Sequence, residues 1–394
     1  MRQVNQMLYR TPRLTGQAET ICGQIDDLRT TLKHRIGQPK QWTGVLSRWT
    51  FARNIQGSNT IEGYNVTEDD AVGEVADDQP MTADRETWLA VCGYRDAMTY
   101  VLQLADDQNF SCGVELLRSL HFMMMHHDFT KSPGRWRPGV VYVRNERAEV
   151  VYDPPEVELV PTLMSDLVAW LGSPAPEEHP IARAAMGHLN LTLIHPFADG
   201  NGRMARCLQS LMLARQGILG AHFCSIEEYL GRNRQAYYEA LTDVAHGKWS
   251  PHRSAFPFVK FCLTAHYRQA HTLLRRVRMT EKVWEQLDTE IKQRKLPERV
   301  RLALADAAFV FRVTNQRYRK LAEISDNLAS RDLQGLVNQK LLAPKGERRG
   351  RYYERATSLK SIWERARETG PIPDPFEEEE KAISSSVQRQ LFAR

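Results

Sequence analysis

The 394-residue sequence predicts a mostly α-helical protein with one small β-hairpin, followed by a second and smaller module. Apolar residues recur at helical spacing over much of the chain, as at Ile21, Ile25 and Leu28. Runs typical of β-strands are short, and they occur in pairs around a charged turn. The length also exceeds the roughly 250–300 residues at which a single core stops growing, so we expect more than one folding unit.

Helices are expected to fill the first third of the chain. The periodicity predicts them over 18–33, 87–103 and 113–125. A segment rich in proline and glycine comes after them at 132–139 and ends the helical pattern.

Two short β-branched runs, 140–143 and 150–152, come next and predict a β-hairpin. The following helix is expected to begin at Pro180, because proline suits the first turn of a helix, and to end at His195. His188 on that helix is expected to pack in the core rather than to act as a second base.

The stretch from His195 to Arg206 concentrates chemical groups, and it reads HPFADGNGRMAR. Gly200 and Gly202 flank Asn201 and allow a sharp turn whose backbone N–H groups approach a ligand closely. An apolar pattern with interspersed arginines comes directly after, so we expect a helix to open from this turn. A turn of this kind at a helix N-terminus is an anion site.

Each residue type in the stretch suggests a role. His195 suits a general base that takes a proton from a hydroxyl, because its ordinary pKa lies near neutrality. Asp199 is a hard oxygen ligand of the kind that Mg²⁺ accepts when phosphates and water complete its shell. Arg203 and Arg206 lie three apart on one helix face and can grip neighbouring phosphate oxygens. Asn201 offers a neutral donor for a phosphoryl oxygen.

A simpler alternative is a Gly-Asn-Gly turn between two helices, with a surface histidine beside it. One of these residues alone would favour that alternative. All of them together, in this order, favour a phosphate site. Phe197 is expected to pack under the loop as an anchor rather than to take part in chemistry.

With these residues in view, the stretch resembles the Fic family signature, His-x-Phe-x-(Asp/Glu)-Gly-Asn-Gly-Arg-x-x-Arg, at every fixed position. Most Fic proteins transfer AMP from ATP to a Ser, Thr or Tyr hydroxyl of a target protein. The resemblance implies that His195 deprotonates this hydroxyl, that Asp199 holds Mg²⁺ against the α- and β-phosphates, and that Arg206 holds the γ-phosphate. The nucleotide-binding residues implied within the motif are Gly200, Asn201, Gly202, Arg203, Met204, Ala205 and Arg206. The related Doc branch, which phosphorylates its targets, usually lacks Gly-Asn-Gly, so this loop favours AMP transfer.

Far upstream, the run Ser58-Asn59-Thr60-Ile61-Glu62-Gly63 resembles the (Ser/Thr)-x-x-x-Glu-(Gly/Asn) inhibitory motif of many Fic proteins. In a helix, Ser58 and Glu62 lie four apart on one face, and Gly63 is suited to end that helix. The resemblance implies that Glu62 pairs with Arg206 and keeps it from the γ-phosphate of ATP. The ordinary alternative is a helix end with a solvated glutamate.

The same resemblance implies two further contacts. The hairpin 140–152 corresponds to the flap, which positions the target segment by strand addition in Fic proteins; the alternative is a purely structural hairpin. The segment 229–238 resembles the one that flanks the base and ribose, with Asn233, Tyr237 and Tyr238 as candidates. Tyrosines at helical spacing are, however, more often core residues.

The last third of the chain has a different sequence pattern from the rest. A basic stretch with leucine spacing predicts a long linker helix, and two short helices come after it with a turn near Ser325, a good N-cap. A strand, a basic turn and a strand are expected over 341–353. This order resembles a winged helix-turn-helix domain of the type often appended to Fic proteins. A domain of this type fits either of two partners, duplex DNA or another protein. The basic residues of its second helix and wing are Arg331, Arg348, Arg349 and Arg351.

The composition argues against several classes of protein, including membrane-spanning and disulfide-rich proteins. No run approaches the roughly 18 apolar residues of a membrane span, and no signal-peptide core comes after Met1. The six cysteines are scattered without a Cys-x-x-Cys pair, which argues against a structural zinc site or a disulfide framework and predicts a cytoplasmic protein. The net charge of +5 does not by itself indicate a nucleic-acid partner.

The resulting prediction is an autoinhibited protein adenylyltransferase with ATP as substrate and Mg²⁺ as its metal. It is expected to modify a target protein that docks on the flap, and also itself, without a membrane; a homodimer is left open. Two alternatives stay open: the same site removes AMP, with Glu62 orienting a water, or the chain is a DNA-binding regulator whose Fic domain only senses nucleotide. The expected divisions are an N-terminal helical region 1–110, a Fic domain 111–265, a helical linker 266–300, a winged helix 301–360 and a tail 361–394, mobile in part from Pro371.

Overall fold

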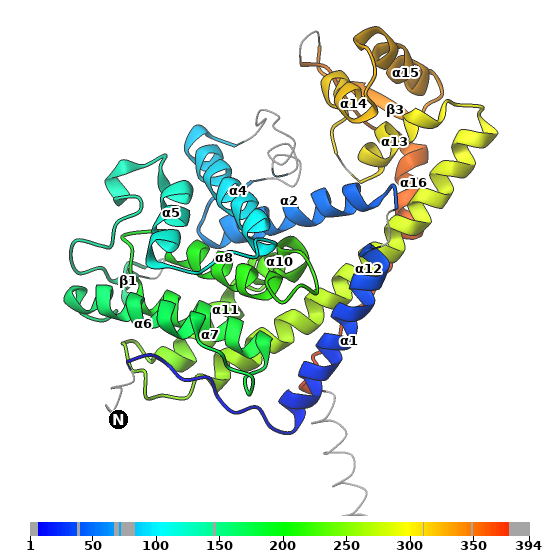
Figure 1. Ribbon diagram of the computed structural model, residues 1–394. Coiled ribbons are helices and arrows are strands. Elements are labelled where there is room, and N and C mark those ends of the chain that lie inside the picture. The colour runs from blue at the N-terminus through cyan, green and yellow to red at the C-terminus, as the bar shows by residue number, and fades with distance from the viewer. Residues whose placement is uncertain are drawn as a thin grey trace, which may run out of the picture.

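The computed structural model describes residues 7–37, 40–66, 71, 83–144, 147–309, 311–347 and 350–377 (Figure 1). Its architecture is mostly helical, as predicted. The N-terminal helices are α1 (Gln17–Gly37), α2 (Thr43–Ile61), α4 (Arg85–Ala105) and α5 (Val114–Met125). The predicted helices over 18–33, 87–103 and 113–125 correspond to α1, α4 and α5 and are confirmed.

The central region contains the helices that surround the motif. They are α6 (Val160–Gly172), α7 (Pro180–Ile194), α8 (Asn201–Ala214), α9 (Ala221–Cys224), α10 (Glu227–Arg232) and α11 (Arg234–Ala245). Pro180 occupies the first turn of α7, and α8 opens directly from the glycine turn, both as predicted. Helices α7 and α8 pack against each other, and nearly every side chain of both is buried. The stretch between them therefore lies at the centre of the fold.

The hairpin is present but shorter than predicted. Strand β1 (Val143–Arg144) pairs antiparallel with β2 (Val150–Tyr152). Of the expected first strand, 140–143, only Val143 is paired within the described part of the chain. The residue after β2, Asp153, bridges to Lys248 instead, so β2 does not extend alongside 140–142.

One helix connects the central region to the C-terminal module. Helix α12 (Phe256–Gln293) is 38 residues long, and α1 packs along it (Figure 1). It begins ten residues before the predicted linker, because Phe258, Val259 and Cys262 are buried in the core. The predicted boundary between 265 and 266 consequently falls inside this helix.

The C-terminal module lies at the far end of α12 (Figure 1). It contains α13 (Arg301–Ala308), α14 (Asn315–Ala322), α15 (Asp326–Asn338), strands β3 (Leu342–Lys345) and β4 (Tyr352–Arg355), and α16 (Thr357–Ala366). Ser325 caps α15, as predicted, by accepting a bond from the Leu328 amide. Strands β3 and β4 pair antiparallel, and Val313 bridges to Tyr353. Arg331 and Arg351 are exposed, whereas Arg348 and Arg349 lie outside the described residues.

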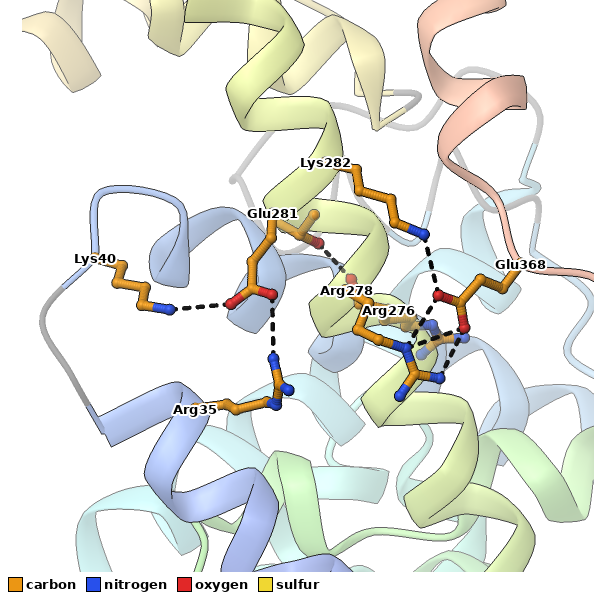
Figure 2. A network of polar contacts seen from close by, with 8 residues as sticks. Arg35, Lys40, Arg276, Arg278, Glu281, Lys282 and Glu368 are labelled. Carbon is orange, nitrogen blue, oxygen red and sulfur yellow. Dashed lines mark hydrogen bonds and ion pairs between the residues drawn. The ribbon is translucent and has the colours of Figure 1, made fainter.

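The segment 367–377 returns along α12 instead of leaving the fold. Glu368 accepts hydrogen bonds from Arg278 and Lys282 of α12, as Figure 2 shows. Further along, Arg275 donates to the carbonyl of Gly370, and Arg268 pairs with Asp374. This part of the predicted mobile tail is therefore placed, while 378–394 lies outside the described residues.

Two expectations drawn from composition can be compared with the structure. All six cysteines are described and free. Among the described residues, no helix has both the length and the apolar character needed to cross a membrane.

Candidate active site

The signature residues form a tight loop between the two central helices. His195 ends α7 in the left-handed conformation, with φ 52° and ψ 56°. Gly200 precedes α8 with φ 77°, a conformation that glycine adopts without strain. We call residues 195–200 the motif loop. It places a histidine and an aspartate directly at the N-terminus of α8.

His195 has the protonation state that a base needs. Its Nδ1 lies 3.2 Å from the carbonyl oxygen of Thr192. A carbonyl can only accept, so Nδ1 carries the hydrogen and Nε2 presents its lone pair. Burial lowers the pKa of His195 to about 4, with a smaller lowering contribution from Arg137. The imidazole is therefore neutral at ordinary pH and can take up a proton.

Asn201 braces the loop. Its Oδ1 accepts from the amide of Phe197 at 2.9 Å, and its Nδ2 donates to the carbonyl of Phe197 at 3.0 Å. The oxygen and one of the two Nδ2 hydrogens are thus used by the loop itself. The expected donation from Asn201 to a phosphate stays a prediction.

His121 of α5 supports the loop and was missed by the sequence reasoning. Its ring stacks on Phe197 at 3.7 Å between centroids. Its Nδ1 accepts from the amide of Gly134, so Nε2 carries the hydrogen and donates to the carbonyl of Asp199 at 3.0 Å. No local motif surrounds His121, and only the tertiary fold brings it here. The predicted anchor role of Phe197 agrees with its complete burial.

Asp199 is the residue that fits a divalent cation. Its Oδ1 accepts from the amide of Gly200, while Oδ2 is 3.9 Å from Lys131 Nζ in a partly exposed position. Among the described residues, no cluster of three His, Cys, Asp or Glu side chains offers a complete protein-made metal site. A single carboxylate suits Mg²⁺ when substrate phosphates and water supply the other ligands.

The two motif arginines are buried cations with unused hydrogen-bond donors. Arg203 is fully buried; its Nη2 contacts Met125 Sδ, and its Nε and Nη1 lack acceptors among the described residues. Nη1 of Arg206 also lacks an acceptor in this part of the chain. A buried donor without a partner is costly, and a bound anion would relieve that cost. Together with the N-terminus of α8, the two guanidinium groups form a site suited to an anion.

Met204 and Ala205 belong to the core and not to that site. Both side chains are completely buried, and the amide of Met204 already donates to the carbonyl of Gly200. The nucleotide contacts implied for these two residues do not fit the structure. They contribute by packing α8 against its neighbours.

The upstream motif lies directly on Arg206, as the resemblance implied. Oε1 of Glu62 accepts from Arg206 Nη2 at 2.6 Å. Ser58 accepts from the same guanidinium through both its hydroxyl, at 2.8 Å from Nε, and its carbonyl, at 3.1 Å from Nη2. Gly63 comes just after the end of α2 with φ 89°. Although burial raises the pKa of Glu62, Arg206 and Arg203 lower it further, so the carboxylate is ionised.

Glu62 also occupies the space above the start of α8. A Cβ placed on Gly202 would lie 2.5 Å from Glu62 Oε1 and 3.0 Å from Arg206 Nη1. A side chain at position 202 would therefore force the ends of the Glu62 and Arg206 side chains to shift. Glu62 therefore holds an anionic group against the helix N-terminus, where an anion is favoured.

Of the three candidates for the base and ribose, Tyr237 is buried, Asn233 is partly exposed and Tyr238 is exposed. Tyr237 is buried, and its hydroxyl bonds to His188 Nε2, while His188 Nδ1 donates to Gln209. The expected nucleotide contact of Tyr237 is therefore wrong, and His188 is a packed histidine as predicted. Asn233 donates to the carbonyl of Tyr229, whereas Tyr238 is exposed and donates to the carbonyl of Ile61.

Arg137, which the sequence reasoning missed, ties the hairpin to the motif loop. It is buried, and its Nε donates to the carbonyl of His195 at 3.0 Å. Its other guanidinium donors reach the carbonyls of Gly139 and Pro155, on either side of the hairpin. Tyr152 of β2 adds a bond to the carbonyl of Leu193 at 2.6 Å. The hairpin and the last turn of α7 are thus held together by buried side chains.

Comparison with known proteins places these features in a family context. Residues 111–213 match the sequence model of the Fic/DOC family. The chain is 30% identical over 215 residues to "Protein adenylyltransferase Fic" of Nematostella vectensis, an alignment that covers 54% of this chain and 46% of that protein. It is 32% identical over 211 residues to "Protein adenylyltransferase fic-1" of Caenorhabditis elegans, covering 52% and 40%. The chain therefore spans less than half the length of these curated relatives.

Solved structures share the fold. A Fic family protein from Desulfovibrio desulfuricans superposes with a TM-score of 0.55 at 22% identity, over 89% of this chain and 99% of that one. A Fic domain containing signaling protein from Bacteroides thetaiotaomicron gives 0.51 at 22% identity, over 65% and 96%. At this identity the likeness concerns the fold alone.

Proposed function

Residues 111–213 are a Fic/DOC family domain, and from this premise we propose that the chain is an autoinhibited protein adenylyltransferase. One observation carries the proposal. Two buried arginines with unused donors face the N-terminus of α8, beside a neutral histidine and a partly exposed aspartate. This arrangement fits a nucleoside triphosphate next to a base. The names of the curated relatives support AMP as the transferred group.

The reaction uses the groups present in the site. Nε2 of His195 takes the proton of the target hydroxyl as its oxygen attacks the α-phosphorus of ATP. A new P–O bond forms to the target, and the bond to pyrophosphate breaks. Asp199 would hold Mg²⁺, which neutralises phosphate charge. Arg203, Arg206 and the α8 N-terminus hold the phosphates in place, so most of the rate enhancement comes from positioning and electrostatics.

Inhibition results from competition for Arg206. Glu62 and Ser58 occupy two of its donor nitrogens, and the Glu62 carboxylate lies where a γ-phosphate would approach. ATP bound in this state lacks its γ-phosphate ligand, and its α-phosphate is misplaced for attack. Once Glu62 moves away, Arg206 is free to bind the γ-phosphate of ATP.

The decisive test is Glu62→Gly in the full chain, measured as labelled AMP transferred from ATP to the protein itself. Removing a charge-assisted pair that must break before reaction is worth about 1.5–3 kcal/mol, so transfer should rise about ten- to a hundredfold. Ser58→Ala, which leaves Glu62 in place, should give a smaller gain. Arg206→Ala should be inactive with or without Glu62. A Glu62→Gly variant no faster than wild type, or one that rescues Arg206→Ala, would contradict the proposal.

For the target protein, we propose docking on the flap 140–152. Val150 of β2 is exposed there, as are Val140 and Tyr142 just before β1, and the hairpin offers a strand edge that can accept an extended peptide. The order α13, α14, α15, β3 and β4 with the Val313–Tyr353 bridge supports a winged helix for the C-terminal module. Gel mobility of duplex DNA at low salt, with wild type and with Arg331→Ala plus Arg351→Ala, separates a DNA partner from a protein partner.

A further inference from the structure

Helix α2, which ends on Arg206, begins against the C-terminal module. Nη2 of Arg48 bonds to Oδ1 of Asp306 in α13 at 2.7 Å. The ring of the neighbouring Trp49 lies 5.4 Å from that of Phe309, just after α13. Arg301 of α13 donates to Gln41, just before α2, at 2.9 Å. The inhibitory helix and the C-terminal module therefore share a direct interface.

Asp306 makes this interface part of the module's own core. Its side chain is buried, and its second oxygen pairs with Arg317 of α14 at 3.0 Å. One carboxylate thus joins α2, α13 and α14. A displacement of α13 or α14 changes the position of the oxygen that Arg48 binds.

Near its C-terminal end, α2 packs so closely on α10 that no side chain fits between the two helices. A Cβ on Gly57 would lie 2.4 Å from the carbonyl oxygen of Glu227, and one on Gly231 would lie 2.7 Å from Gly57 Cα. Helices α2 and α10 therefore meet backbone to backbone. Arg276 of α12 adds a further tie, because it pairs with Glu228 and covers the Trp49 ring. We therefore expect a change at one end of α2 to act on the helix as a whole.

The two ends of α2 are close enough to be coupled. Ten residues separate Arg48 from Ser58, which is about 15 Å along a helix. Figure 1 shows α2 running from the central region towards α12 and α16. The helix forms one continuous body between the Asp306 carboxylate and the Arg206 guanidinium.

We propose that α2 is an allosteric connection by which the C-terminal module controls how firmly Glu62 and Ser58 hold Arg206. A partner that binds the module more tightly when α13 is displaced from α2 would favour release of Arg206, by its differential affinity for the two arrangements. The proposal rests on the proposed function in one respect, that Arg206 is the ligand of the γ-phosphate.

The test compares Arg48→Met with wild type in the full chain. Arg48 is partly exposed, and its loss leaves Asp306 paired with Arg317, so the variant should fold. Two readouts are used: AMP transfer from labelled ATP to the chain, and the ratio of ATP to ADP affinity by calorimetry. Since ADP lacks the γ-phosphate, this ratio reports the availability of Arg206 even without transfer. Both should rise roughly fivefold, at the low end of typical couplings between sites. Gln41→Ala, at the exposed edge of the same interface, should give a smaller rise.

A double variant with Glu62→Gly and a matched control variant inside the module test whether the effect passes through Arg206. In Glu62→Gly, where only Ser58 still holds Arg206, adding Arg48→Met should change both readouts much less than it does in the wild type. Lys360→Met removes an exposed pair with Glu364 within α16, inside the module and away from α2, and it should leave both readouts at wild-type values. An Arg48→Met variant equal to wild type would overturn the proposal, and so would a full additional gain on Glu62→Gly or an equal gain from Lys360→Met. If Glu62→Gly shows no AMP transfer but a raised affinity ratio, the proposed function fails while the coupling is still tested.

Discussion

At the scale of single residues, the site depends on side chains that bind the backbone of the motif loop as much as on groups that face a ligand. Asn201, His121 and Arg137 together bond to the backbone of Phe197, Asp199 and His195. They hold His195 in its left-handed conformation, which a non-glycine residue adopts only at some cost.

Replacing the base should stop the reaction and leave the nucleotide bound. His195→Ala is expected to reduce AMP transfer by about 10²–10⁴-fold, the usual effect of losing one general base. ATP affinity by calorimetry should change little, because the arginines and the loop carry the phosphates. His126→Ala, which replaces an exposed histidine at the end of α5, is the control. Wild-type transfer by the His195 variant would remove it from the mechanism.

Arg137 should affect the pH profile of transfer. A base works in its neutral form, so activity should decline only as the pH falls towards the pKa of His195, about 4. Besides Arg137, which lowers that pKa, Glu62 and Asp199 act on it and raise it. Arg137→Met removes a lowering charge, so the decline should move to higher pH. Arg137→Lys keeps the charge but not the planar fork; it should lower kcat without moving the profile.

The control for this profile is Arg183→Met. Arg183 also donates to backbone carbonyls, including that of Ser173 at the end of α6, on a segment outside the motif loop. Its loss should leave the profile in place. An unshifted profile in Arg137→Met would show that Arg137 has no electrostatic effect on the base.

Spacing along the chain was enough to find some site residues but not others. Two short motifs contain these residues: His195, Asp199 and Arg206 lie between the end of α7 and the start of α8, and Glu62 lies at the end of α2. The role of Tyr237 was misjudged, because a hydroxyl binds whichever partner the tertiary fold brings closest. Arg137 and His121 lie outside any motif, and only packing reveals them.

At the scale of elements, the interface of α2 with α10 determines where Ser58 and Glu62 lie. The close approach at Gly57 and Gly231 leaves no room for a side chain at either position. A sequence does not reveal this, because a helical glycine looks the same whether it faces solvent or another backbone. In the same way, the hairpin was predicted too long, since the pairing of Asp153 with Lys248 depends on a distant segment.

Gly57→Ala should separate these two helices. The added methyl meets backbone atoms that cannot rotate away, so the free energy of unfolding should fall by about 1–3 kcal/mol. Gly23→Ala is the matched control, because Gly23 lies on the exposed side of α1 with nothing within 4 Å. It should instead raise stability by about 0.5–1 kcal/mol. Denaturant unfolding of both variants measures the contrast, and equal values would mean that the contact is not tight.

At the scale of the whole molecule, the chain closes on itself along α12. The segment 367–377 passes from the C-terminal module back towards α1, and Gln17 donates to the carbonyls of Pro375 and Phe376. The sequence predicted a partly mobile tail from Pro371, because of the acidic run 377–380 and the serine run after it. A row of arginines on α12 instead provides donors for its carboxylates and carbonyls.

Acid should release this segment before it unfolds the core. Hydrogen bonds from Arg278, with Lys282, lower the pKa of Glu368 to about 2. A depressed pKa contributes stability that is present above the ordinary value near 4.5 and is lost as the pH falls towards 2. Glu368→Gln should therefore increase hydrogen exchange in 367–377 at neutral pH and remove the change in that window. Unaltered exchange would show that the other contacts suffice.

The unbroken length of α12 has a consequence for how this protein can vary. Every residue inserted into an α-helix advances the rest of the chain by about 1.5 Å and rotates it by about 100°. One extra residue between the central region and α13 would thus swing the C-terminal module around the helix axis and carry Asp306 away from Arg48. Insertions that preserve the contact must come in whole turns and must also be matched in α2. The lengths of α12 and α2 are therefore linked, and a change in one requires a matching change in the other.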